Sequence, residues 1–282
     1  MKILITGGTG QLGRALSRLA PQGHSVVAFG SSKVDVTNRD IVRRKLHDHV
    51  PEVVIHAGAM TNVDGCETDP EAAKRVNIDG TANVVESARE IGARVIYIST
   101  NYVFDGETDA PYQEDDRPNP ISVYGRTKLD AETVVGREPN AIVIRTAMLY
   151  DETGRNFVNT MLGLAENRPR LVGVDDQFGN PTYAGDLARA IYELLATDAA
   201  GIFHLVNEGV TSWYGWANEL FRIMENPITV DPIPASSFPR SARPPRYGAL
   251  ENTRAAALGV RLPSWEDGLR RCLDRRAHLS GT

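Results

Sequence analysis

The chain has 282 residues, of which 41% are hydrophobic and 24% charged, so it is a globular protein with one large core or two joined lobes. Its net charge of -5 and isoelectric point of about 5.7 argue against nucleic acid or an anionic membrane as a partner. No apolar run reaches the roughly 18 residues of a membrane span, and the N-terminus does not resemble a secretory signal. We therefore expect no membrane span and a cytoplasmic location.

Cysteine and histidine usage gives two further expectations. Without an export signal, Cys66 and Cys272 are expected to be two reduced thiols rather than a disulfide. The six histidines show no metal-ligand spacing, so we predict no metal site.

The first residues read as a strand, a glycine-rich turn and a helix. The apolar run at 2–6 precedes Gly7, Gly8, Gly10 and Gly13, and helical periodicity follows. Glycines permit positive φ, let the backbone approach a pyrophosphate, and place that anion at the positive end of a helix. The pattern favours a dinucleotide site, and the alternative is a tight turn without a ligand.

Strand-like and helix-like segments alternate through the first two thirds of the chain. Strands are predicted at 2–6, 25–29, 52–56, 94–98, 141–145 and 202–206, and helices at 11–20, 38–48, 70–91, 122–135 and 184–197. The strands are short and nearly all apolar, which predicts an α/β fold with a doubly wound, Rossmann-type parallel sheet. The segments Gly7–Gly13, His56–Thr61 and Ser99–Tyr102 follow strand ends and should face one crevice.

The alternation loosens after about residue 150. We expect a dinucleotide-binding domain over 1–150, to which 181–206 returns, and a smaller C-terminal substrate-binding lobe from 151–180 and 207–282. Six prolines in 226–246 exclude a regular helix or a central strand. We interpret this segment as an extended loop, either a lid that faces the substrate or a passive connector.

A last helix is predicted after Ser264, which is a suitable N-cap. Its basic run RRCLDRR, at 270–276, is interpreted as a solvated helix face rather than a binding patch.

Tyr124 and Lys128 are four residues apart on a predicted helix and follow the pair Ser99 and Thr100. Residues at i and i+4 share one face of a helix, so the ammonium is expected to lower the pKa of the phenol. A tyrosine tuned in this way is a useful general acid or base.

Taken in order, the motifs resemble the dTDP-4-dehydrorhamnose reductase family of the extended short-chain dehydrogenase/reductase superfamily. The resembling stretches include ITGGTGQLG (5–13), ISTNYVFDG (98–106), YGRTKLDAE (124–132), VDDQFGNPTYAGDLARAI (174–191) and RPPRYGALENT (243–253). The resemblance implies NAD(P)H-dependent reduction of the 4-keto group of a dTDP-4-keto-6-deoxy-L-hexose.

The resemblance also implies three catalytic roles. Tyr124 would donate a proton to the nascent alkoxide, Lys128 would hold the nicotinamide ribose and tune Tyr124, and Thr100 would hydrogen-bond the substrate carbonyl. Ser99 could replace Thr100, but neighbouring strand residues point to opposite faces, so we expect only one of them to meet the substrate. We favour Thr100.

Further contacts follow from the same resemblance. The cofactor residues would be Gly7, Gly10, Gln11, Leu12 and Gly13 at the pyrophosphate, Asp35 and Val36 at the adenine, and Ala57, Gly58, Ala59 and Thr61 toward the ribose and nicotinamide. Asp35 has an equal alternative as a turn or N-cap residue. His56 ends a buried strand and is expected to be a core histidine.

Val63, Asn101, Tyr102 and Met148 are the expected substrate contacts. Two of these depart from the family pattern. Asn101 stands where many members have Asp, and Met148 stands where a Trp is common, which would give a softer wall to the sugar site. The identity of the hexose is therefore left open.

The strand at 25–29 is followed by Gly30, Ser31, Ser32 and Lys33, with no acidic residue to bind the ribose 2′-hydroxyl of NAD. This favours NADPH as the cofactor, with NADH as the alternative. The segment could also be an ordinary polar turn without a role in cofactor choice.

Two other functions share these motifs. One is a sugar-nucleotide epimerase or dehydratase of the same superfamily. The other is a non-catalytic dinucleotide-binding regulatory subunit of the methionine adenosyltransferase type. The oligomeric state is left open, with a homodimer as one option.

Overall fold

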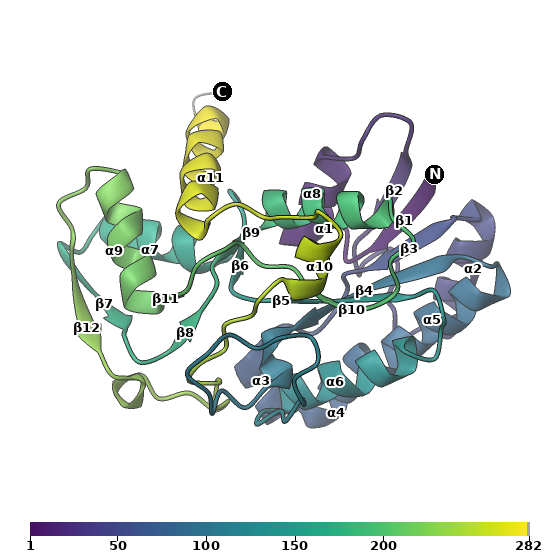
Figure 1. Ribbon diagram of the computed structural model, residues 1–282, viewed down its shortest axis with the longest axis horizontal. Helices are drawn as coiled ribbons and strands as arrows, with labels where there is room; N and C mark the ends of the chain where they lie inside the picture. The colour runs from purple at the N-terminus through teal and green to yellow at the C-terminus, as the bar shows by residue number, and fades with distance from the viewer. Residues whose placement is uncertain (281–282) are drawn as a thin grey trace.

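A six-stranded parallel sheet forms the centre of the molecule in the computed structural model, which describes residues 1–280 (Figure 1). In spatial order its strands are β10 (Gly201–His204), β5 (Ile142–Thr146), β4 (Arg94–Thr100), β3 (Val53–His56), β1 (Lys2–Thr6) and β2 (Ser25–Phe29). All neighbouring pairs are parallel, which confirms the predicted doubly wound α/β fold. The chain order reverses between β1 and β3, where such sheets bind ligands.

Helices cover both faces of this sheet (Figure 1). One face carries α1 (Gln11–Arg18) and α8 (Ala184–Leu195), and the other carries α2 (Arg39–His49), α5 (Gly80–Glu90) and α6 (Val123–Val135). Alternate residues of β1 enter different cores, since Ile3 and Ile5 pack with α1 and α8 while Leu4 packs with α2 and α5. The strands are apolar throughout because both of their faces are buried.

The continuous helix predicted over 70–91 is wrong, because a widened turn interrupts it. The segment consists of α4 (Pro70–Lys74), a π-helical turn η1 (Arg75–Asp79) and α5. Within this turn the buried Asn77 accepts a hydrogen bond from the Met60 amide at 2.8 Å and donates to Thr127 Oγ1 at 3.0 Å. The extra residue turns Asn77 toward the loop after β3, and π-turns of this kind are frequent at functional sites.

A smaller set of elements packs beside the sheet, at the left of Figure 1. Its strand pairs are β6 (Leu149–Tyr150) with β9 (Thr182–Tyr183), β7 (Arg170–Val174) with β12 (Thr229–Ile233), and β8 (Phe178–Gly179) with β11 (Thr211–Ser212). Its helices are α7 (Phe157–Ala165), α9 (Trp213–Ile223) and α11 (Trp265–Ser280), with the 3₁₀ turn η3 (Ala235–Ser237). Aromatic residues such as Tyr150, Trp216 and Phe221 fill its core.

The division into two lobes stays a proposal. Helix α10 (Thr253–Ala257) lies in the C-terminal part of the chain, yet Ala255 packs in the core of the main sheet together with Val260 and Leu262.

The prediction of an extended loop over 226–246 is wrong for residues 229–233. These residues form β12, which pairs in parallel with β7 alone. Because β12 has no strand on its other side, the missing N–H of Pro232 leaves no neighbouring strand without a hydrogen-bond donor. The exclusion of a central strand and of a regular helix holds for this segment.

The predicted start of the last helix is confirmed, because the amide of Asp267 donates to Ser264 Oγ at 3.3 Å. The prediction of a solvated face holds for Arg270 and Asp274, which are exposed, but the run also makes contacts with the rest of the protein. Arg271 Nη2 bonds Asp186 Oδ2 at 2.6 Å and Arg275 Nε pairs with Glu152 Oε1 at 2.9 Å. These arginines attach α11 to the rest of the protein because each reaches a buried carboxylate.

Cys66 and Cys272 are both free, and they are buried in separate apolar clusters. Across residues 1–280, no helix combines the length and the apolar character that crossing a membrane requires. In that same part of the chain, no three His, Cys, Asp or Glu side chains gather as metal ligands would.

Two adjacent carboxylates, Asp151 and Glu152, lie buried where α1 meets the smaller lobe. Arg14 Nη2 donates to Asp151 Oδ2 at 3.3 Å, and Arg18 Nη2 donates to Glu152 Oε1 at 3.1 Å. Tyr183 Oη donates to the same Glu152 oxygen at 2.5 Å. The pair therefore connects the helix after the glycine turn to β6 and β9.

The two carboxyl groups hydrogen-bond to each other, and Arg18 Nη2 lies 3.7 Å from Asp151 Oδ1. Burial, together with the hydrogen bond and charge of Glu152, raises the pKa of Asp151 to about 7. Burial also opposes ionisation of Glu152, but hydrogen bonds from Asp151 and Tyr183 hold the pKa of Glu152 below its usual value. A proton on Asp151 reduces the repulsion between the two carboxyl groups.

We expect Asp151 to make the stability of the protein depend on pH. Its pKa is raised above the unfolded value of about 3.9, so the native state retains the proton that the unfolded chain releases. The free energy of unfolding should fall as pH rises from about 4 to about 7, by at most about 1.4 kcal/mol per pH unit. The side chain of Asp151→Asn cannot ionise. The free energy of unfolding of this variant, measured by urea unfolding from pH 5 to 8, should therefore fall less steeply with pH than that of the wild type.

The exposed Asp130→Asn provides a matched control that should keep the wild-type slope. Equal slopes for wild type and Asp151→Asn would contradict the raised pKa.

Candidate functional site

A cavity of about 560 Å³ lies at the carboxyl ends of β1, β3, β4 and β5. The three segments predicted to converge do face it, since Gly7–Gly13, the residues after His56 and the end of β4 all contribute lining residues. From the predicted set it is lined by Gly7, Gly10, Gln11, Leu12, Gly13, Ala57, Gly58, Ala59, Thr61, Val63, Thr100, Asn101, Tyr102, Tyr124, Lys128 and Met148. The fold has brought together residues up to 206 positions apart in the chain, from Gly7 to Trp213.

The glycine turn is held by close backbone contacts. Gly7 has a φ of +70°, and a Cβ there would lie 2.6 Å from the carbonyl carbon of Ala57. A Cβ on Gly13 would overlap the backbone of Gly7 and Gly8. Gly10 differs, because the one atom near its Cβ position is Gly7 O at 3.1 Å, and its outer side is exposed to the cavity. Gly7 and Gly13 therefore serve the turn, while Gly10 leaves room for a ligand.

Asp35 and Val36 are not among the residues that line this cavity. Asp35 Oδ1 accepts hydrogen bonds from the amide of Thr37 at 3.0 Å and from its hydroxyl at 2.8 Å, which makes Asp35 a turn residue. The N-cap of α2 is Asn38, whose Oδ1 accepts from Ile41 N. The predicted adenine contacts of Asp35 and Val36 stay a prediction.

His56 is a core histidine, as predicted. Its ring nitrogens lie 2.6 Å from Thr6 Oγ1 and 3.1 Å from Thr81 Oγ1, and it is fully buried. Burial, and then the charge of Lys128, lower the pKa of His56 to about 3, so it is neutral near the cavity.

Tyr124 and Lys128 lie one turn apart on α6, as their spacing predicts. The helix approaches the turn at Tyr102 closely, because Ser122 caps it and Gly125 has no side chain to meet the Tyr102 backbone. The rings of Tyr102 and Tyr124 contact edge to face with centroids 5.5 Å apart. This contact fixes where the Tyr124 ring lies.

The expected lowering of the Tyr124 pKa by Lys128 is wrong for this structure. Burial raises the pKa of Tyr124 well above its usual value, although a hydrogen bond with Thr100 acts in the opposite direction. Lys128 does not reach the phenol, because its Nζ donates to the carbonyl of Ile98 at 2.6 Å and lies 4.1 Å from the centre of the Tyr97 ring. The phenol is thus fully protonated at neutral pH.

Lys128 is a buried amine. Burial lowers the pKa of Lys128 to about 7, and the negative charge of Glu132 limits that fall. Glu132 is itself fixed by Arg145, whose Nη2 donates to Glu132 Oε2 at 2.7 Å. A buried lysine whose pKa is lowered in this way is typical of functional sites.

Ser99 and Thr100 both line the cavity, but their hydroxyls have different partners. The Ser99 hydroxyl donates to Glu132 Oε1 at 2.5 Å, away from Tyr124. The Thr100 hydroxyl lies beside Tyr124 and also accepts from the amide of Tyr102 at 3.2 Å. Thr100 therefore supplies the hydroxyl at the phenol.

Asn101 and Met148, the two residues that depart from the family pattern, each contact another part of the chain. Asn101 Nδ2 donates to the carbonyl of Gly248 at 2.7 Å, which connects the end of β4 to the segment 243–253. Met148 has a φ of +44° and packs its sulfur against Gly179. Both residues line the cavity.

Trp213 is a lining residue that sequence reasoning missed. It opens α9 after the cap Ser212, packs against the tilted ring of Phe157 and stacks with Trp216. Its indole also lines a second cavity of about 630 Å³ between α7, β7 and β12, and so separates two neighbouring spaces. The position of Trp213 in the first turn of a helix is visible in the sequence, but its approach to Met148 and Thr100 depends on the packing of α9.

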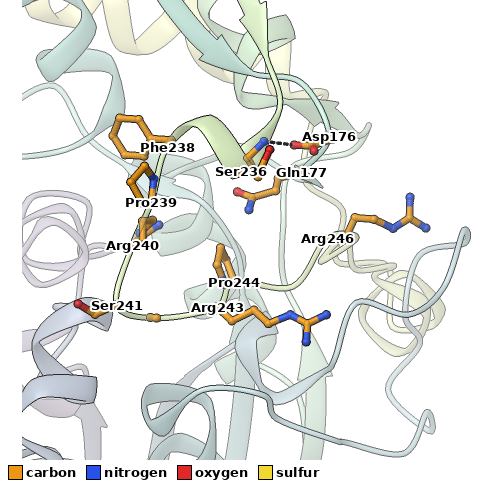
Figure 2. A pocket seen from close by; sticks show the side chains of 12 residues that line it. Asp176, Gln177, Ser236, Phe238, Pro239, Arg240, Ser241, Arg243, Pro244 and Arg246 are labelled. Carbon is orange, nitrogen blue, oxygen red and sulfur yellow. Dashed lines mark hydrogen bonds between the residues drawn. The ribbon is translucent and has the colours of Figure 1, made fainter.

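A third hollow, of about 400 Å³, adjoins the second along the segment from Ala235 to Arg246. Figure 2 shows this segment passing Gln177, with the side chains of Arg243 and Arg246 extended from it. Arg240 lines both the second and the third space, and its Nε donates to Asp64 Oδ2 at 3.1 Å. The second and third spaces share several lining residues, and the first and second are neighbours on either side of Trp213.

Comparison with known proteins identifies the family. The model of the RmlD substrate binding domain matches residues 1–278. The chain belongs to this family. A dTDP-4-dehydrorhamnose reductase from Sinorhizobium fredii is 37% identical, with 96% of each chain covered. A probable dTDP-4,6-dihydroxy-2-methyloxan-3-one 4-ketoreductase from Streptomyces antibioticus is 40% identical, with 96% of this chain and 94% of its own covered.

Among solved structures, the dTDP-4-dehydrorhamnose reductase of Bacillus anthracis in complex with NADP superposes with a TM-score of 0.94. It is 34% identical, and the match covers 97% of this chain and 99% of that one. The RmlD family match thus extends over both the sheet and the smaller lobe.

In this RmlD-family chain Gly10 and Gly13 should respond differently to substitution. Gly10→Val should fold but weaken NADPH binding tenfold or more, about 1.4 kcal/mol, because its side chain enters the cavity. Gly13→Ala should instead destabilise the protein by about 1–3 kcal/mol through overlap with the turn. Fluorescence titration with NADPH and urea unfolding separate the two effects. Unchanged NADPH affinity in folded Gly10→Val would contradict the site.

Proposed function

We propose that the protein is an NADPH-dependent reductase of the 4-keto group of a dTDP-4-keto-6-deoxy-L-hexose. The observation that carries the proposal is the meeting of Thr100, Tyr124 and Lys128 in the same cavity as the glycine turn. Support comes from relatives named dTDP-4-dehydrorhamnose reductase that match almost the whole chain. A cytoplasmic location and a homodimer remain predictions from the sequence.

The residues present fit a dinucleotide. The unfilled space beside Gly10 and the N-terminus of α1 suit a pyrophosphate, and Gly7 brings this turn against Ala57. Ser31 lines the same cavity at the end of β2, and Lys33 is exposed close by in the chain. These residues would hold NADPH, which supplies the hydride when it is bound.

The side chains of the cavity then control charge on the substrate oxygen. As a C–H bond forms at the carbonyl carbon, the electron pair of the carbonyl moves to oxygen, and Tyr124 Oη gives its proton to that oxygen. The raised pKa of Tyr124 keeps the proton available at neutral pH. The Thr100 hydroxyl beside it donates a hydrogen bond that strengthens as charge develops. Lys128 would hold the ribose hydroxyls.

The two cavities on either side of Trp213 offer a place for each part of a nucleotide sugar. We place the sugar beside Thr100 and Tyr124, and the base in the second cavity, where Phe157, Trp213 and Phe238 supply aromatic surface. Arg240 also lines this second cavity, and we expect its guanidinium, which pairs with Asp64 in this structure, to bind the diphosphate. In this placement the segment 235–246 acts as a lid, the first of the two alternatives weighed for it.

We expect Lys33 to contribute to cofactor preference. Lys33→Ala removes an exposed positive charge near the end of β2, so the preference for NADPH over NADH should narrow by about threefold to tenfold. The ratio of kcat/KM for the two cofactors measures this change, and Lys74→Ala at an exposed position of α4 is the control. A wild-type enzyme that prefers NADH would contradict the assignment.

Tyr124→Phe should lower kcat by roughly 10²–10⁴, the usual contribution of a positioned general acid. The protein should still fold and bind NADPH, because the phenol oxygen alone is removed. Thr100→Val should also lower kcat, and the two losses should not add, since both groups act on one oxygen. Near-normal turnover by Tyr124→Phe with the keto-sugar would exclude this mechanism.

A further inference from the structure

Asn156 connects the glycine turn to the smaller lobe. Its side chain is nine-tenths buried, and its Nδ2 donates to Gln11 Oε1 at 2.9 Å and to the backbone carbonyl of Asp151 at 2.8 Å. Its Oδ1 accepts from the amide of Asn159 at 2.9 Å, which makes it the N-cap of α7. One amide side chain therefore reaches the first residue of α1 and the first turn of α7.

The backbone partners of Asn156 fix which way its amide faces. Nδ2 must face the Asp151 carbonyl, and Oδ1 must face the Asn159 amide. The reverse orientation would place two acceptor oxygens together and two N–H donors together. Gln11 can then meet Asn156 Nδ2 only with its oxygen, Oε1. This leaves the Nε2 amino group of Gln11, a residue that lines the cavity, without a hydrogen-bond acceptor among residues 1–280.

We propose that Asn156 is a positioning residue that holds the Gln11 amide so that its N–H donors serve the pyrophosphate of the cofactor. The proposal rests on the proposed function for the identity of that cofactor. A free glutamine can present either end of its amide, and an oxygen turned toward a phosphate repels it. Asn156 selects the donor end before the cofactor arrives, so less ordering is required on binding.

The same contact couples the cofactor turn to the substrate side. Phe157, the residue after Asn156, lines the second cavity and packs against Trp213, which lines the first. Arg14 supports this junction from α1, since it donates to Thr9 O at 2.6 Å and to Thr153 O at 3.2 Å. A shift of α7 on substrate binding would therefore reach Gln11 directly.

Asn156→Ser tests the proposal because serine is also a good N-cap but is too short to reach Gln11. The dissociation constant for NADPH, measured by fluorescence titration without any sugar, should rise by about threefold to tenfold. The thermal midpoint should fall modestly, because the hydrogen bond to the Asp151 carbonyl is lost as well, and Asp69→Ser, a cap exchange on α4, should leave NADPH affinity unchanged. A double-mutant cycle with Gln11→Ala completes the test.

In the Gln11→Ala background, Asn156→Ser should have no further effect on NADPH affinity, because it acts through Gln11. Unchanged affinity in Asn156→Ser, or an equal loss with and without Gln11, would overturn the proposal. Neither outcome depends on turnover of a keto-sugar, so the test is separate from that of the reaction. If the protein binds no NADPH at all, the proposed function fails instead.

Discussion

The close contact between the glycine turn and the end of β3 is the constraint on which the site depends. Gly7 at positive φ lies against the backbone of Ala57, and no side chain fits between them. This contact fixes the start of α1, and with it Gly10 beside the cavity and Gln11 beside Asn156. The end of β4 and helix α6 then close the opposite side with Thr100, Tyr124 and Lys128.

Burial governs the chemistry of that opposite side. It disfavours charge on both groups, so it raises the pKa of Tyr124 and lowers the pKa of Lys128 to about 7. A protonated phenol suits a reductase, because reduction requires a proton donor at the substrate oxygen. The spacing of the two residues predicts their common face but not this result, since the lysine bonds the Ile98 carbonyl rather than approaching the phenol.

The sheet could be predicted from the sequence because its strands are apolar on both faces, and the convergence of their ends follows from parallel topology. Features that depend on distant partners could not. The helical pattern of 70–91 gives no sign of the turn at Asn77, which forms because Asn77 bonds Met60 and Thr127. The sequence likewise gives no sign that Arg275 pairs with the buried carboxylate of Glu152, which lies far from it in the chain. Trp213 reaches the cavity only through the packing of α9.

The most direct test of the account is the stoichiometry of the reaction with a dTDP-4-keto-6-deoxy-L-hexose and NADPH, with the product identified by NMR. The account predicts that one NADPH is consumed for each C4 hydroxyl formed. Product formed without net consumption of NADPH would instead indicate an epimerase or dehydratase. Tight NADPH binding with no turnover of any keto-sugar nucleotide would contradict catalysis and favour a regulatory subunit.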